Sequence, residues 1–127
     1  MIDRKAALNR LVVGDIFHAT SAEEAPLVSL ITSITDTTIH ARTMTTQYSL
    51  KFDRQTGKGE LKGEIRTVRC TMDSIAPLPV DIHNVMLGLD RKSRLEWKEE
   101  RIKLNEDEKR ALLFLDSHYE ANPLPPA

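Results

Sequence analysis

The sequence predicts an α+β protein: a small five-stranded antiparallel barrel or strongly bent sheet, followed by a two- or three-helix C-terminal region. Ten of the eleven threonines lie between Thr32 and Thr71, and threonine, which is β-branched, favours strands. In the same part of the chain, short segments alternate between apolar and polar residues, which is the period of a half-buried strand. After Pro77 and Pro79 the apolar residues recur with helical spacing instead, so the chain changes there from strands to helices.

The N-terminal segment predicts a short helix and then a first strand. The first ten residues are compatible with one or two helical turns, which Gly14 ends. Residues 12–19 predict a strand with a bend at Gly14, and we expect Ile16 and Phe17 to point into the core. Residues 21–26 are small and polar and end in proline, so they predict a loop.

Four further strands are predicted by alternation, over residues 27–35, 38–44, 48–52 and 65–72. The clearest signal is the third of these, in which Tyr48, Leu50 and Phe52 alternate with polar residues. In the last of them, Cys70 falls on the apolar face. We therefore expect this thiol to be a core residue rather than a reactive one.

Residues 53–63 are expected to form an exposed, mobile hairpin loop. They contain three of the five glycines together with several charged residues, which is a composition typical of loops. The resulting sheet resembles SH3-like small barrels in the number and length of its strands. No sequence motif carries this resemblance, so it implies no function.

The part of the chain beyond the prolines predicts two or three helices. The first spans residues 80–89, where apolar residues share one face. A capping box formed by Ser93 and Glu96 predicts a short charged helix that runs to Lys103. Asn105 predicts the N-cap of a last helix over residues 106–120. The chain is thus divided into a barrel-like domain with its short N-terminal helix, residues 1–76, and a helical region packed on that domain or on a partner, residues 77–127.

Composition and charge narrow the classes of function. The chain has 18 Lys and Arg against 19 Asp and Glu, a net charge of −1, which excludes a protein held on nucleic acid by bulk charge. Cys70 is the single cysteine, so an internal disulfide is impossible and a reducing compartment is favoured. Apolar runs are too short for a signal peptide or a membrane span. We therefore expect a cytoplasmic protein with no membrane partner.

No arrangement of residues predicts catalysis. None of the four histidines has the spacing to another that would place both on one helix face as metal ligands. The tripeptide Gly57-Lys58-Gly59 lacks the spacing and the following helix of a nucleotide-binding P-loop. We therefore expect a protein that is not an enzyme, with no catalytic residue, metal ligand or cofactor.

One candidate surface is basic and lies on the outward strand faces and the glycine-rich loop. Its candidate nucleic-acid-binding or anion-binding residues are His40, Arg42, Lys51, Arg54, Lys58, Lys62 and Arg66. Aromatic residues make up 5% of the chain, which leaves few platforms for stacking bases. Two alternative hypotheses follow: a small-barrel nucleic-acid-binding protein, or a binder that sequesters a phosphorylated small molecule.

The other candidate surface is apolar and lies in the helical region. Its candidate protein-interface residues are Met86, Leu89, Leu95 and Trp97. A helical region with more apolar residues than it needs for its own packing is typical of a protein interface. The main hypothesis is therefore a non-catalytic protein-interaction or adaptor module that binds a protein partner or a second copy of itself as a homodimer.

Overall fold

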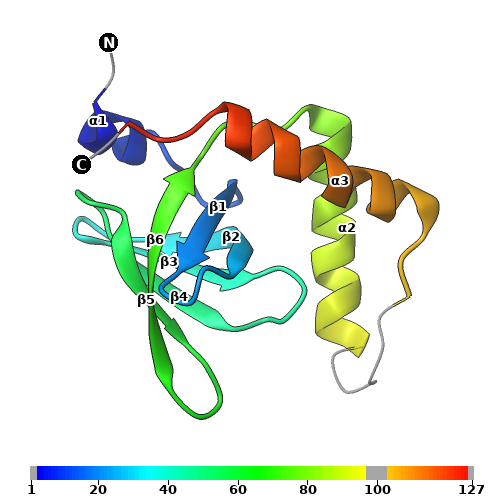
Figure 1. The fold of residues 1–127 in the computed structure, drawn as a ribbon, viewed down its shortest axis with the longest axis horizontal. Helices are drawn as coiled ribbons and strands as arrows, with labels where there is room; N and C mark the ends of the chain where they lie inside the picture. The colour runs from blue at the N-terminus through cyan, green and yellow to red at the C-terminus, as the bar shows by residue number, and fades with distance from the viewer. Residues whose placement is uncertain (1–2, 97–102, 126–127) are drawn as a thin grey trace.

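Six antiparallel strands close into a barrel, a short helix precedes them, and two longer helices follow (Figure 1). The computed structural model describes residues 3–96 and 103–125. Each strand pairs with the next, and the last pairs with the first, so every described strand has two neighbours. The elements are α1 (Arg4–Asn9), β1 (Ile16–Ser21), β2 (Pro26–Ile34), β3 (Thr38–Thr43), β4 (Ser49–Asp53), β5 (Lys58–Lys62), β6 (Thr67–Ser74), α2 (Val80–Glu96) and α3 (Glu106–Ala121).

The predicted α+β barrel is confirmed, but the predicted number of five strands is wrong. The sixth strand, β5, lies within the segment that we expected to be an exposed hairpin loop. Leu61 is its one buried residue, and the position two before it on the same face is Gly59, so the alternation of the strand contains a single apolar side chain. Gly59 is required by close packing, because a Cβ atom there would lie 1.9 Å from the carbonyl oxygen of Lys51 on β4. Glycine in this strand therefore reflects contact between backbones, not a loop.

The inward faces of the strands form an apolar core. Phe17 and Phe52 pack edge to face near its middle, with ring centroids 5.5 Å apart. Cys70 is buried, as expected, and this burial raises the pKa of its thiol to about 11. A thiol that stays protonated is a poor nucleophile. The barrel core also contains Ala19, Ile31, Ile39, Ala41, Leu50, Leu61 and Met72.

Helix α1 and the C-terminal tail close one end of the barrel, where the two chain termini lie near each other (Figure 1). Leu8 of α1 and Leu124 of the tail both belong to the barrel core. Arg4 donates hydrogen bonds to the carbonyl oxygens of Thr56, in the β4–β5 turn, and Met72, in β6. It thereby fixes α1 to two segments of the barrel that are far apart in sequence.

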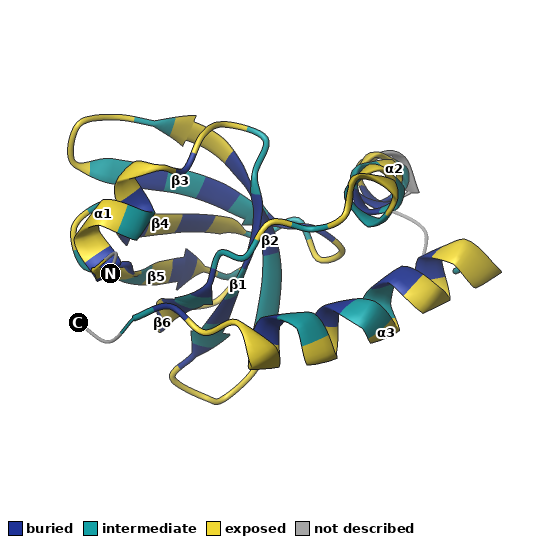
Figure 2. Cartoon of the chain, turned by 90° about the horizontal axis from the view of Figure 1, so that it is seen from above, coloured by how far each residue is buried: buried dark blue, intermediate teal, exposed yellow. Residues whose placement is uncertain are grey.

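A second apolar core joins the outside of the barrel to the two C-terminal helices. Ile16, Leu30 and Met44 form its barrel side, and the expected interface residues Met86 and Leu89 form its α2 side. Helix α3 has its C-terminal end beside the barrel and runs from there past α2, with its buried residues on the side that faces the barrel and α2 (Figure 2). The α3 side of this core consists of Ala111, Leu115 and Tyr119, with Leu112 partly buried.

The boundary predicted inside the helical region is wrong, whereas the start of α3 is confirmed. Ser93 lies within α2, and its hydroxyl donates to the carbonyl oxygen of Leu89 at 2.8 Å. The capping-box pattern there has no helix end to cap, because α2 continues through it. Residues 97–102 of the predicted short helix lie outside the described residues. Asn105 and Glu108 do form a reciprocal capping box at the start of α3.

Candidate binding groove

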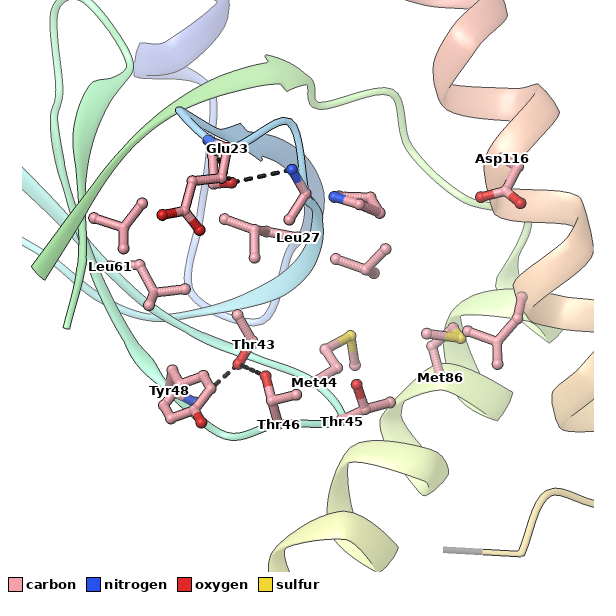
Figure 3. A pocket seen from close by; sticks show the side chains of 16 residues that line it. Glu23, Leu27, Thr43, Met44, Thr45, Thr46, Tyr48, Leu61, Met86 and Asp116 are labelled. Atoms are coloured by element: carbon pink, nitrogen blue, oxygen red, sulfur yellow. Dashed lines mark hydrogen bonds between the residues drawn. The ribbon is translucent and has the colours of Figure 1, made fainter. Parts of the chain in front are cut away.

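The barrel end opposite α1 is open and holds an apolar cavity of about 410 Å³ (Figure 3). Leu27, Tyr48, Leu61 and Val68 line it from the barrel mouth. Leu112 and Asp116 continue the lining on the side of the helices, where the cavity also borders Met44 and Met86, which are 1% and 0% exposed. A cavity of this size with mostly apolar walls has the dimensions of ligand-binding sites.

A second cavity, of about 430 Å³, adjoins the first along α3. Val28 of β2 and Leu112 and Asp116 of α3 line both cavities. Leu104 and the exposed Leu113 line the second cavity only. The two cavities are neighbours that follow one another from the barrel mouth toward the start of α3, and we call the pair of them the groove.

Two turns with strained backbone border the mouth of the barrel. Glu24, in the β1–β2 connection, has φ of 63°, and Gln47, in the β3–β4 turn, has φ of 61°. Non-glycine residues rarely adopt positive φ, and such residues cluster at binding sites. In the first connection, the Ser21 hydroxyl accepts hydrogen bonds from the backbone N–H groups of Glu23 and Ala25. Side-chain contacts therefore hold the strained backbone in place.

Asp90 of α2 attaches the second turn to the helix that forms the opposite wall. Its carboxylate accepts hydrogen bonds from the Arg42 guanidinium, at 2.8 and 3.2 Å, and from Gln47 Nε2, at 2.9 Å. Burial alone would raise the pKa of Asp90, but these hydrogen bonds outweigh it and hold the pKa below its ordinary value. The ionised carboxylate thus stabilises the position of the turn relative to α2.

Few charged side chains line the groove, and carboxylates prevail among them. Glu23 and Asp116 line the first cavity from opposite sides (Figure 3). Glu23 pairs with Arg66, which reaches across from the β5–β6 turn. Lys109 lines only the second cavity and pairs with Glu106 on its own helix, at 3.4 Å. No basic residue lines the first cavity, counting the described residues.

The residues of the predicted basic surface do not come together as expected. Arg42 turns to Asp90, Arg66 pairs with Glu23, and the Arg54 guanidinium donates to the carbonyl oxygen of Thr35 at 3.0 Å. These three arginines have intramolecular roles, which the sequence did not reveal because their partners lie on other elements.

The remaining four predicted basic residues, His40, Lys51, Lys58 and Lys62, stay on the outer barrel face. Strand pairing places Glu60 between Lys51 and Arg69 in one row across this face. A shallow cavity of about 630 Å³ here is lined by Lys51, Lys58 and Arg69, but also by Asp53 and Glu60. The two carboxylates reduce the positive potential of the face.

The described residues of the predicted apolar interface lie inside the chain's own core. Met86 and Leu89 are 0% exposed, because they pack in the core between barrel and helices. Trp97 and the side chain of Leu95 lie outside what the structure describes. Sequence periodicity correctly placed Met86 and Leu89 on a buried helix face, but it could not distinguish packing on the chain's own barrel from packing on a partner.

A cluster of polar side chains that sequence reasoning missed lies on the outside of β1 and β6. Asp73 contacts His18 Nδ1 at 2.5 Å and accepts a hydrogen bond from Thr20. Burial alone would raise the pKa of Asp73, but these contacts outweigh it and lower the pKa. The tilted ring of Tyr119 covers His18, with ring centroids 5.5 Å apart. None of the cavities above includes these residues, so we assign the cluster a structural role.

No family model, curated protein or solved structure matched the chain. Within residues 3–96 and 103–125, no three His, Cys, Asp or Glu side chains gather where they could bind a metal ion. None of the described helices is both long and apolar enough to span a membrane. The groove is therefore the feature of the described chain that points to a function.

Proposed function

We propose that the chain is a non-catalytic protein-interaction module that binds an apolar segment of a partner protein in the groove. The observation that carries this proposal is the junction of two apolar cavities through the shared residues Val28, Leu112 and Asp116. Two neighbouring cavities fit a peptide segment better than a compact small molecule, because side chains along the segment can occupy successive cavities. The single buried thiol, Cys70, is consistent with a role in the cytoplasm.

The closed barrel determines how a peptide can be recognised. Every described strand already has two neighbours, so a peptide has no free sheet edge to extend. Recognition must instead use side chains that enter apolar cavities, as when a helix or a short extended segment lies in a groove. Hydroxyl groups at the mouth, such as those of Thr45 and Tyr48, supply a few polar contacts to orient the segment.

Selection from a random dodecapeptide library displayed on phage tests this proposal. Leu112→Gln places a polar group where both cavities meet, and Val13→Gln alters an exposed apolar residue in the α1–β1 connection. We expect selected peptides to bind the unchanged chain and Val13→Gln equally. Binding to Leu112→Gln should be about tenfold weaker, the loss expected for one buried leucine contact. Far-UV circular dichroism establishes that both variants are folded.

Two results would overturn the proposal. One is a library from which nothing is enriched on the unchanged chain. The other is a set of peptides that bind Leu112→Gln as tightly as they bind the unchanged chain. A homodimer in native mass spectrometry that Leu112→Gln converts to monomer would support the groove with a second copy of the chain as its occupant.

Anion binding on the outer face of β4, β5 and β6 is the second candidate, favoured by the shallow cavity beside Lys51, Lys58 and Arg69. It covers both the nucleic-acid hypothesis and the phosphorylated small molecule. The test is fluorescence anisotropy with a labelled thymidine oligonucleotide, alongside thermal shift with ATP. If this candidate is right, Lys51→Glu with Lys58→Glu abolishes both signals, and oligonucleotide affinity falls steeply with salt. Signals that persist in the double variant would exclude it.

A further inference from the structure

We infer that the groove selects partner segments in which a lysine or arginine lies next to the apolar anchor residues, and that Asp116 pairs with this cation. The inference rests on the proposed function, because it names the chemistry of the segment that the groove would bind. It concerns a single carboxylate at the junction of the two cavities. Specificity of this kind, in which apolar contacts supply affinity and one charge sets orientation, is common at protein interfaces.

Asp116 is placed in the groove by helix geometry. It lies four residues after Leu112, so the two side chains share one face of α3. Both line both cavities, and Leu112 packs against the core between barrel and helices. A cation of the bound segment that reaches Asp116 would therefore stand beside apolar side chains seated in the groove.

The charges around Asp116 leave its carboxylate available. Within the described part of the chain it forms no ion pair, whereas Asp107 and Glu106 of the same helix pair with Arg110 and Lys109. The other acidic residue of the first cavity, Glu23, is already paired with Arg66. The groove thus presents one unused negative charge and repels segments with carboxylates at the same position.

The position of Asp116 distinguishes it from an ordinary surface carboxylate. Glu120, one turn further along α3, is also exposed but lines neither cavity. A charge that lies in solvent on a helix contributes little to binding. A charge that an apolar ligand partly covers interacts more strongly, because water no longer screens it as well. Glu120 is therefore the matched control for Asp116.

The experiment uses the dodecapeptide library on three forms of the full chain: unchanged, Asp116→Asn and Glu120→Gln. On the unchanged chain and Glu120→Gln we expect peptides enriched in apolar residues with an adjacent lysine or arginine. On Asp116→Asn the apolar residues should persist and the basic residue should lose its enrichment. For the tightest peptide, isothermal titration should show about two- to fivefold weaker binding to Asp116→Asn. Replacing the peptide's basic residue by glutamine should produce the same loss, and the two losses should not add.

The possible failures are distinguishable. The selection could yield apolar peptides that depend on Leu112 but carry no basic residue. If these peptides bind Asp116→Asn as tightly as the unchanged chain, the inference is overturned and the proposed function stands. An equal loss of affinity in Glu120→Gln would also overturn it, because the effect would then come from the general charge of α3. A selection that enriches no peptide would overturn the proposed function and the inference together.

Discussion

One end of the barrel is capped, and the other end is open. At one end, α1 and the tail cover the core, and Leu8 is completely buried. At the other end none of the described helices caps the strands, and Leu27 and Tyr48 line an open cavity instead. The chain thus places its stabilising contacts at the capped end and leaves the open end available for binding. Regions that bind ligands commonly have fewer packing contacts than the scaffold that supports them.

The turns at the two ends also differ in backbone strain. The positive-φ residue in the turn at the capped end is Gly57, for which this conformation carries no strain. At the open end the corresponding residues are Glu24 and Gln47, for which it is unfavourable. No glycine relieves the backbone strain at these two positions. The side chains there, or the shape of the turns, are therefore expected to have a role other than stabilising the fold.

The largest expected effect is a difference in how much a leucine side chain at each end of the barrel contributes to stability. Leu8→Ala removes a fully buried side chain from the capped end, and we expect it to reduce the free energy of unfolding by about 3–4 kcal/mol. Leu27→Ala, at the open end, removes a side chain that already faces a cavity, so about 1 kcal/mol is expected. Urea unfolding followed by circular dichroism measures both. Equal losses for the two variants would contradict the division of the barrel into a stabilising and a binding end.

A smaller effect is expected where the open end is attached to α2. Asp90→Asn removes the charge that accepts hydrogen bonds from Arg42 and Gln47, and should lower the free energy of unfolding by about 2 kcal/mol. Asp107→Asn is the control, because its ion pair with Arg110 is exposed and should contribute little. Hydrogen exchange should quicken in the β3–β4 turn of Asp90→Asn. Unchanged exchange there would show that Asp90 does not hold the turn.

Substitutions at the positive-φ residues of the two ends should change the stability of the fold by different amounts. Gly57→Ala forces an unfavourable φ and brings a Cβ atom within 2.9 Å of Arg4 Nη2, so we expect a loss of about 1–2 kcal/mol. Glu24→Gly relieves strain at the mouth but makes the unfolded chain more flexible, and the net change should stay within about 0.5 kcal/mol. Thermal unfolding compares them. A marked loss in Glu24→Gly would mean that this turn is not strained.

The smallest effect is a difference in acid sensitivity. The pKa of Asp90 is lowered in the folded protein, so its ionised form stabilises the fold above the unfolded-state pKa of about 4. This contribution is lost as the pH falls through the lower, folded-state pKa. Asp73 behaves in the same way. Denaturant unfolding between neutral and acidic pH should show a shallower loss of stability in Asp90→Asn than in the unchanged chain. Parallel pH profiles would indicate that Asp90 titrates normally.

The sequence was informative wherever local patterns decide structure. Alternation in Tyr48, Leu50 and Phe52 correctly identified a strand, and Asn105 correctly identified a helix start. It failed at β5, where Gly59 is needed for close contact between strands and offers no side chain to alternate. It failed again at Ser93, because a capping pattern inside a helix looks the same as one at its end.

The candidate site was less predictable than the fold, because it depends on contacts between distant segments. Val28 and Leu112 are 84 positions apart by their numbers, yet they line the same two cavities. Arg42 looked like a surface cation, since nothing near it in sequence reveals its partner Asp90. Asp116 was one of many helix-surface charges until the fold placed it beside the groove. The sequence shows that such charged residues are present, but only the tertiary structure shows which residues lie next to them.

Nuclear magnetic resonance tests most directly whether the open end of the barrel and the adjoining groove are the binding surface. The tightest peptide from the selection is titrated into the ¹⁵N-labelled full chain, and shifts of the backbone amide signals are mapped. We expect shifts in the β1–β2 connection, in the β3–β4 turn and around Leu112 of α3, with none in α1. Shifts confined to α1 and the tail, or to the outer face around Lys51 and Arg69, would contradict this expectation.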